Sequence, residues 1–174
     1  MLYLNSKSFL CIFKQSVRDA FIQSWQSDKE SNQVLCSLYN HIKTDFSYEI
    51  YLDQVTSPAL RRLITQMRTS EHILRIETRR YGQQRLERFE RSCQVCGSGD
   101  VEDEFHFVFK CEAYVDIRHV YINSDYYRRP SVMKLISLSI SSNTSVLNKL
   151  AIFIKKHTYT EFDTKQIVIF YVSL

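Results

Sequence analysis

Three cysteines and one histidine lie close together in the sequence and are suited to hold a metal ion. Cys93, Cys96, His106 and Cys111 have the spacing C-x2-C-x9-H-x4-C. Two thiolates in a C-x2-C pair can point from one tight turn at a single ion. Because the four side chains complete a tetrahedral coordination sphere, the spacing predicts a structural zinc site with no open position for an activated water.

The residues that follow the cysteine pair help to choose among the possible roles of that pair. Gly97 and Gly99 come directly after Cys96 and are two of only three glycines in the chain. We expect them to let the backbone fold back under a metal without a Cβ clash. A redox C-x2-C pair normally opens a helix, and Gly-Ser-Gly starts no good helix, so redox chemistry is disfavoured. Two alternatives stay open, that the cysteines are ordinary buried thiols and that His119 replaces one ligand.

The acidic run Glu102-Asp103-Glu104 lies between the cysteine pair and His106. It is expected to bond to His106 behind the metal or to cap a short helix. Catalytic carboxylates are not the favoured interpretation, because two-metal polymerases typically use adjacent aspartates and the chain has no Asp-Asp pair. It also has no P-loop, Gly-x-Ser-x-Gly or His-Glu-x-x-His motif. The sequence therefore predicts a protein that is not an enzyme.

Arginine is concentrated just before the cysteines. Between Arg61 and Arg91 there are nine arginines, no lysine and four glutamates, which gives a charge of +5, whereas the rest of the chain sums to −1. Arginine suits bidentate contacts to phosphate, so RNA or DNA is the predicted partner. The candidate phosphate contacts are Arg61, Arg62, Arg68, Arg75, Arg79 and Arg80.

An alternative interpretation gives these arginines a purely structural role. They could solvate one face, or pair with nearby glutamates, in a zinc-stapled protein-interaction domain. The glutamates concerned are Glu71, Glu77, Glu87 and Glu90.

Three segments taken together resemble a known family. They are Arg62–Tyr81, Arg91–Cys96 and Val101–Cys111. The chain from roughly Ser57 to Lys156 is similar to the C-terminal CCHC zinc-binding region of animal non-LTR retrotransposon reverse transcriptases, a region located downstream of the polymerase. The resemblance implies a zinc-binding, nucleic-acid-binding fragment that lacks the polymerase domain, which would be a further partner where it is present.

Composition indicates which elements must position these residues. The chain has 174 residues, 44% of them hydrophobic, but only three glycines and two prolines. So few turn residues favour a mainly α fold, a helical domain with a small zinc-stabilised CCHC loop and a possible short C-terminal strand. We expect one compact domain overall, with an N-terminal helical part (1–56), a part with the arginine-rich helices, the CCHC loop and the closing helices (57–156), and an atypical tail (157–174).

Apolar periodicity predicts the helices of the N-terminal half. A helix with one buried face is expected from Lys7 to Gln26, with Trp25 in the core, and a second from Ser31 to His41. The segment Thr44–Thr56 fits a strand or a helix and is left unassigned. Ser57-Pro58 is a typical helix start, with a serine N-cap and proline at the first position. The helix that follows buries one stripe and carries on its solvent side Arg61, Arg62 and Arg68.

The C-terminal half is predicted in shorter pieces. After a break at Thr69-Ser70, a short helix should end at Gly82, and His106 should project from another. Residues 113–121 form a predicted helix with Arg118 and His119 facing outward. A break at 128–130 is followed by closing helices over 131–138 and 144–156.

Cysteine usage and the ends of the chain indicate a compartment. Cys11 and Cys36 lie among apolar residues and are expected to be buried free thiols. The apolar start is too short for a secretory signal, and the C-terminal run Ile167–Leu174 is too short to cross a bilayer. An intracellular protein, nuclear or cytoplasmic, with no membrane partner is therefore expected.

Overall fold

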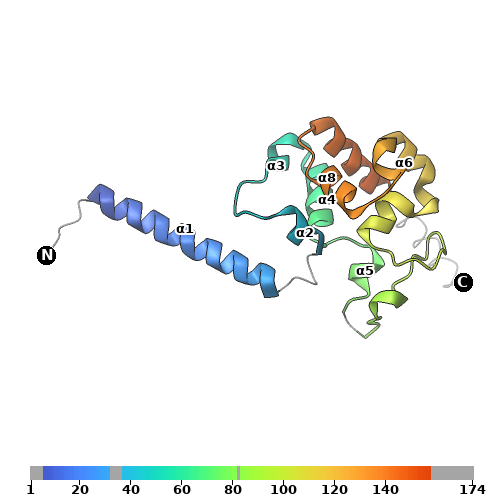
Figure 1. Ribbon diagram of the computed structural model, residues 1–174, viewed down its shortest axis with the longest axis horizontal. Helices are drawn as coiled ribbons and strands as arrows, with labels where there is room; N and C mark the ends of the chain where they lie inside the picture. Colours follow the sequence, from blue (N-terminus) through green and yellow to red (C-terminus); the bar gives the residue numbers. More distant parts are fainter. Residues whose placement is uncertain (1–5, 32–36, 82, 158–174) are drawn as a thin grey trace, which may run out of the picture. The chain divides into compact units, whose positions relative to one another are not determined.

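The computed structural model describes residues 6–31, 37–81 and 83–157 (Figure 1). These residues are mainly helical, and they contain no strand beyond one isolated bridge, which confirms the mainly α fold. The predicted C-terminal strand lies outside them. The chain divides into two units, Met1–Tyr48 and Glu49–Leu174.

The first unit consists of α1 (Ser6–Ser31) and α2 (Ser37–Ile42). The predicted first helix is confirmed, but its predicted buried face is wrong, since Phe9, Phe13 and Phe21 are all exposed. Packing within the unit is concentrated near the end of α1. There Trp25 is half-buried and donates from Nε1 to the Tyr39 hydroxyl at 3.2 Å.

The two cysteines of the N-terminal region do not confirm the expectation of buried thiols. Cys11 lies on α1 and is exposed, so the prediction is wrong for it. The physical reason is that α1 is covered only near its C-terminal end, and Cys11 lies near the other end. Cys36 lies outside the described residues, as do residues 32–36 of the predicted 31–41 helix, and the rest of that prediction is helical, mostly in α2.

The second unit starts with α3 (Tyr51–Gln54) and α4 (Pro58–Arg68). The predicted start of α4 is confirmed, because Pro58 occupies its first turn, although the Ser57 side chain makes no capping hydrogen bond. Ile64 and Met67 are buried as predicted. The predicted break after α4 is also present, and Ser70 there has a left-handed backbone with φ 58°.

Short helical segments make up the rest of the second unit. The predicted turn or two of helix between Thr69-Ser70 and Gly82 is the single turn of α5, and the predicted break at 128–130 is confirmed. A last helix covers 144–157, the end of the described residues. The other elements are α5 (Arg75–Thr78), the 3-10 helix η1 (Arg88–Glu90), the π-helix η2 (His106–Lys110), the 3-10 helix η3 (Glu112–Tyr114), α6 (Val115–Tyr121), α7 (Ser124–Tyr127) and α8 (Val132–Ser139).

An aromatic core fixes η2 against the last helix. The Phe107 ring lies 5.0 Å from Phe153, 5.4 Å from Tyr114 and 4.6 Å from His157, measured between centroids. Phe107, Phe153 and Tyr114 are all buried. Because Phe107 is the neighbour of His106, the core holds the backbone from which the predicted metal ligand projects.

None of the helices described is both long enough and apolar enough to cross a membrane.

Candidate metal centre

The four predicted ligands come together in the folded chain. The potential ligand atoms of Cys93, Cys96, His106 and Cys111 all lie within 4.8 Å of one another. The two buried sulfurs, Cys93 Sγ and Cys111 Sγ, are 3.9 Å apart, and Cys96 Sγ is 3.4 Å from His106 Nε2. Tetrahedral zinc, with Zn–S bonds of about 2.3 Å and Zn–N bonds of about 2.0 Å, would hold two sulfurs about 3.8 Å apart and a sulfur and a nitrogen about 3.5 Å apart. The residues therefore fit a tetrahedral metal ion.

A closed loop presents the cysteine pair. Ser92 and Val101 form an antiparallel bridge, and the Cys93 N–H donates to the Asp100 carbonyl at 2.8 Å. Gly97 and Gly99 have φ of 66° and 82°. A Cβ on either glycine would meet nothing within 4 Å, so the predicted clash is wrong. The loop requires glycine because its backbone is left-handed at both positions.

The other two ligands project from the two ends of η2. The Cys111 N–H donates to the His106 carbonyl at 2.7 Å, which joins one ligand's backbone to the other's. Asp103 Oδ1 accepts from the His106 N–H at 2.9 Å, which confirms the predicted helix cap. Sequence periodicity thus found the helical position of His106, although it predicted no π-helical turn.

Arg118 was expected to face solvent, and this prediction is wrong. Its side chain is buried, with 4% of the residue exposed. Nε donates to the Val108 carbonyl at 2.7 Å, and Nη2 donates to the Cys111 carbonyl at 2.6 Å. The carbonyls at the end of η2 need donors, and this guanidinium supplies them from the next helix. Arg118 therefore holds the backbone that carries the Cys111 ligand.

The carboxylate behind the histidine is one that sequence reasoning missed. His106 Nε2 faces Cys96, and His106 Nδ1 lies 3.6 Å from Asp100 Oδ2. This distance exceeds an ordinary hydrogen bond, but the arrangement is the one by which carboxylates orient metal-bound histidines. In the sequence Asp100 is only an acid beside Gly99. The loop that brings it to His106 is visible only in the structure.

The acidic run serves the surrounding structure instead of the metal. Glu102 Oε2 accepts from the Arg75 N–H at 3.1 Å, at the start of α5. Glu104 lies 2.9 Å from His72 Nε2 and 3.2 Å from Ser70 Oγ. Burial opposes the charge on Glu104, but the hydrogen bond and attraction to His72, together with hydrogen bonds from the backbone and Ser70, outweigh it and lower the pKa of that carboxyl.

α5 is joined to both sides of the cysteine loop. The Ile76 N–H donates to the Glu102 carbonyl at 3.1 Å, and the Ile76 carbonyl accepts from Arg91 Nη1 at 2.8 Å. Arg91 is buried, and its Nε also donates to the Leu86 carbonyl at 2.9 Å. The part of the chain with the predicted arginine contacts is therefore bonded directly to the metal-binding loop.

The three thiols have different acidities. Burial raises the pKa of both Cys93 and Cys111. Burial also acts to raise the pKa of Cys96, but hydrogen bonds from Ser98, Cys93 and His106 outweigh it and lower that pKa to about 6. A cation among the three sulfurs would stabilise their thiolates, and three thiolates with one imidazole form a donor set that suits zinc.

Arg68 is buried, contrary to the prediction that it faces solvent. Only 5% of the residue is exposed. Its Nη2 lies 2.6 Å from Glu49 Oε2, its Nη1 donates to the Ser139 carbonyl at 3.3 Å, and its guanidinium lies 4.3 Å from the Tyr51 ring centroid. Because these partners come from other segments of the second unit, periodicity within α4 could not show them. Arg68 is a structural residue rather than a candidate phosphate contact.

The other five predicted arginines differ in exposure. Arg62 is exposed, and the remaining four are half-buried. Arg61 Nε donates to the Val55 carbonyl at 3.0 Å, Arg80 pairs with Glu77 at 2.5 Å, and Arg79 donates to Gln84. Arg75 is half-buried as well, and its backbone N–H donates a hydrogen bond to the Glu102 carboxylate.

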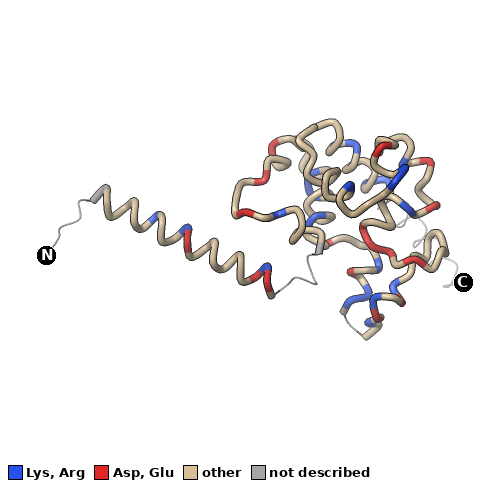
Figure 2. Tube along the Cα trace, in the orientation of Figure 1, with Lys and Arg blue, Asp and Glu red and all other residues tan. Residues whose placement is uncertain are grey.

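Further exposed arginines occur in the segment after α5. Arg85 and Arg88 are exposed, with Arg88 Nη2 3.2 Å from Asp103 Oδ2 and Arg85 Nη2 3.9 Å from Glu87 Oε1. Figure 2 shows Lys and Arg positions gathered along α5 and this segment. Of these exposed arginines, Arg88 thus lies next to the end of the cysteine loop, through its ion pair with Asp103.

His119, the alternative ligand, is exposed and does not belong to the metal-binding group.

No protein-family model, curated protein or solved structure matches the chain.

Proposed function

We propose that this chain is a zinc-stabilised module that binds RNA or DNA, related to the C-terminal region of a retroelement reverse transcriptase and not itself an enzyme. The observation that carries the proposal is the convergence of Cys93, Cys96, His106 and Cys111 within 4.8 Å. Four protein ligands fill a tetrahedral sphere, so a bound zinc has a structural role and does not activate water. Where the parent element's polymerase domain is present, it is a further partner.

Zinc supplies folding energy to a segment that buries little. Residues 83–90 are exposed with the single exception of the half-buried Leu86, and residues 97–100 are exposed as well. Burial of apolar surface cannot offset the entropy of ordering such a segment. Metal binding, which is coupled to folding in small zinc modules, provides the missing stabilisation.

Exposed aromatic side chains beside the exposed arginines support nucleic-acid binding. Phe89 is 75% exposed and is the neighbour of Arg88, and Tyr81 is also exposed. A large apolar ring in water beside a basic group is a combination that binds single strands, because bases stack on the ring while the cation contacts a phosphate. Arg62, Arg85 and Arg88 are the exposed phosphate contacts that we propose from this stretch.

One observation favours a second function, a zinc-stapled protein-interaction domain. Arg68, Arg79 and Arg80 bind acceptors of their own chain, as the interaction-domain interpretation expects. The salt dependence of binding discriminates the two functions, because phosphate contacts release condensed counterions and intramolecular ion pairs do not.

The test is a salt titration of binding to single-stranded and duplex RNA and DNA. Replacing Arg85 and Arg88 together by Gln should flatten the log–log salt slope by about 1.4 on single strands or about 1.8 on duplex. Lys14→Gln with Arg18→Gln, two exposed positions on α1, is the matched control with the same loss of charge. Binding with the same slope in both double variants, or no binding at all, would move the assignment to the interaction domain.

A further inference from the structure

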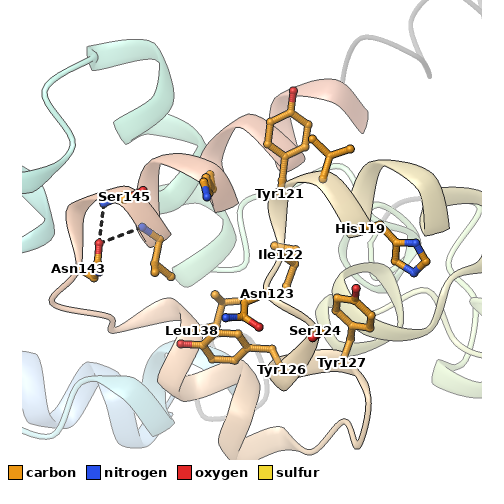
Figure 3. Close-up of a pocket in the computed structure, with 13 residues that line it drawn as sticks. His119, Tyr121, Ile122, Asn123, Ser124, Tyr126, Tyr127, Leu138, Asn143 and Ser145 are labelled. Carbon is orange, nitrogen blue, oxygen red and sulfur yellow. Dashed lines mark hydrogen bonds between the residues drawn. The ribbon is translucent and has the colours of Figure 1, made fainter.

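A second site is suggested by a cavity of about 520 Å³ within the second unit (Figure 3). The end of α6, the short α7 and the start of the 144–157 helix surround it, and Leu138 of α8 lines it as well. Its volume is in the range of pockets that take small organic groups. None of the metal ligands and none of the predicted phosphate-contact arginines lines it, so the centre described above does not explain it.

Aromatic side chains form one wall of the cavity. The rings of His119 and Tyr127 are stacked, with centroids 5.5 Å apart and an interplanar angle of 21°. His119 is exposed and Tyr127 is half-buried. Tyr126, on the same short helix as Tyr127, also lines the cavity, and Figure 3 shows its ring turned away from the stacked pair, toward Leu138. A stacked pair of flat rings at the edge of a cavity is a platform for another flat ring.

Two asparagine amides supply polar groups with a fixed orientation. Asn123 Oδ1 accepts from the Asp125 N–H at 2.9 Å, and Asn143 Oδ1 accepts from the Ser145 N–H at 2.9 Å (Figure 3). Since each oxygen caps a backbone N–H, each side chain offers its NH₂ group to a ligand. Two amide donors therefore belong to side chains that line the cavity, and such donors suit the carbonyl and ring-nitrogen acceptors of a base.

The charge of the cavity favours an anion. Lys149 is the one Lys or Arg side chain among the described residues that line it, and no carboxylate does so. Arg128 and Arg129, which follow α7 directly, are both exposed. A ligand that combines a flat ring, hydrogen-bond acceptors and a negative charge matches these groups.

We propose that this cavity binds one nucleotide of a single-stranded nucleic acid, with its base against the His119–Tyr127 wall and its phosphate near Lys149. The inference rests on the proposed function and deepens it, because it names an unpaired base as what the module recognises away from the arginine-rich stretch. Base stacking on an aromatic side chain tolerates any base, so recognition of strand form rather than of sequence follows.

The test uses the full zinc-loaded chain and 12-nucleotide single strands that carry one 2-aminopurine, whose fluorescence falls on stacking. Tyr127→Leu should weaken binding about fivefold to 150-fold, the range for loss of one stacked base. Lys149→Gln should reduce the salt slope by about 0.7. Tyr48→Leu and Lys14→Gln, both at exposed positions of the first unit, are matched controls that should change neither quantity.

The outcomes separate this inference from the proposed function. A strand that binds equally well to wild type, Tyr127→Leu and Lys149→Gln overturns the cavity site and leaves the nucleic-acid function in place. A chain that binds no strand overturns both. If nucleoside 5′-monophosphates bind at Tyr127 and single strands do not, the occupant of the cavity is a free nucleotide, and the proposal of a strand is wrong. Lys149→Gln, at an exposed position, keeps the test decisive should Tyr127→Leu fail to fold.

Discussion

At the scale of single residues, the acidity of Cys96 separates it from its two partners. Its pKa of about 6 means that the metal-free thiol becomes a thiolate as the pH rises through 6, whereas burial keeps Cys93 and Cys111 protonated. Iodoacetamide should therefore modify Cys96 with a midpoint near pH 6 and leave the buried pair untouched. Peptide mapping after brief labelling, from pH 5 to 9, measures this. Zinc should abolish the labelling; a midpoint near the ordinary thiol value would contradict the expectation.

Arg118 offers a second prediction at this scale. Arg118→Met removes both donors to the Val108 and Cys111 carbonyls and leaves these groups buried without them. We expect a loss of about 2 to 4 kcal/mol in the free energy of unfolding, together with weaker metal binding. Urea unfolding of the zinc-loaded chain measures the first quantity. Arg62→Met, at an exposed position, is the control and should stay within about 0.5 kcal/mol of wild type. Equal losses in the two variants would show that Arg118 has no special role.

The ligands were predictable from the sequence and their supporting residues were not. Metal ligands are constrained by local spacing, which the sequence displays directly. Arg68 and Arg118 were placed in water because they fall outside the apolar stripes of their helices, yet each is buried against a carbonyl of another element or loop. No spacing rule reveals such acceptors, since tertiary packing creates them.

At the scale of elements, the cysteine loop should be the first part to open when metal is removed. Residues 85–103 carry few buried apolar side chains and are closed by a handful of backbone hydrogen bonds. Hydrogen exchange measured with and without zinc should show protection lost first here, while the helix over 144–157, which has one buried face, keeps its protection longer. Equal protection of the loop in both states would argue that metal does not order it.

Elements with strong local signals were predicted best. The start of α4 is confirmed because proline at a first helical turn is a local preference. α1 shows the limit of such reasoning, since apolar periodicity identifies a helical face but not whether anything covers it. The π-helical turn of η2 was not predicted either, and the donor to its Val108 carbonyl, Arg118, comes from α6.

At the scale of the whole molecule, the two units divide where the composition changes little. No glycine or proline occurs between residues 42 and 57, so the sequence does not mark the division after Tyr48. Charge, in contrast, was readable in advance as a property of one stretch. The sequence did not show how many of these arginines form ion pairs within the chain, as Arg68 does with Glu49 and Arg80 does with Glu77.

The metal content of the chain is the prediction that belongs to the whole molecule. We expect about one zinc per chain, because the described residues contain one group of suitable ligands. Cys96→Ser should lose it, and chelation should lower the stability of the second unit as a whole. Elemental analysis of purified protein and thermal unfolding in chelator measure these effects. Cys11→Ser is the matched control, since Cys11 lies on the exposed α1. Normal folding in chelator without any metal would rule out the structural centre.

The bonds between α5 and the cysteine loop have a consequence for how ligands influence one another. Ile76 is tied to Glu102 on one side of the loop and to Arg91 on the other. Suppose that bound zinc holds α5 in this position and that a partner binds more tightly to α5 there. The partner must then raise the affinity for zinc by the same factor by which zinc raises the affinity for the partner, because coupling between two binding equilibria is reciprocal. For such a partner, the concentration of free zinc sets the affinity of binding. Chains bound to the partner then lose zinc less readily than unbound chains do.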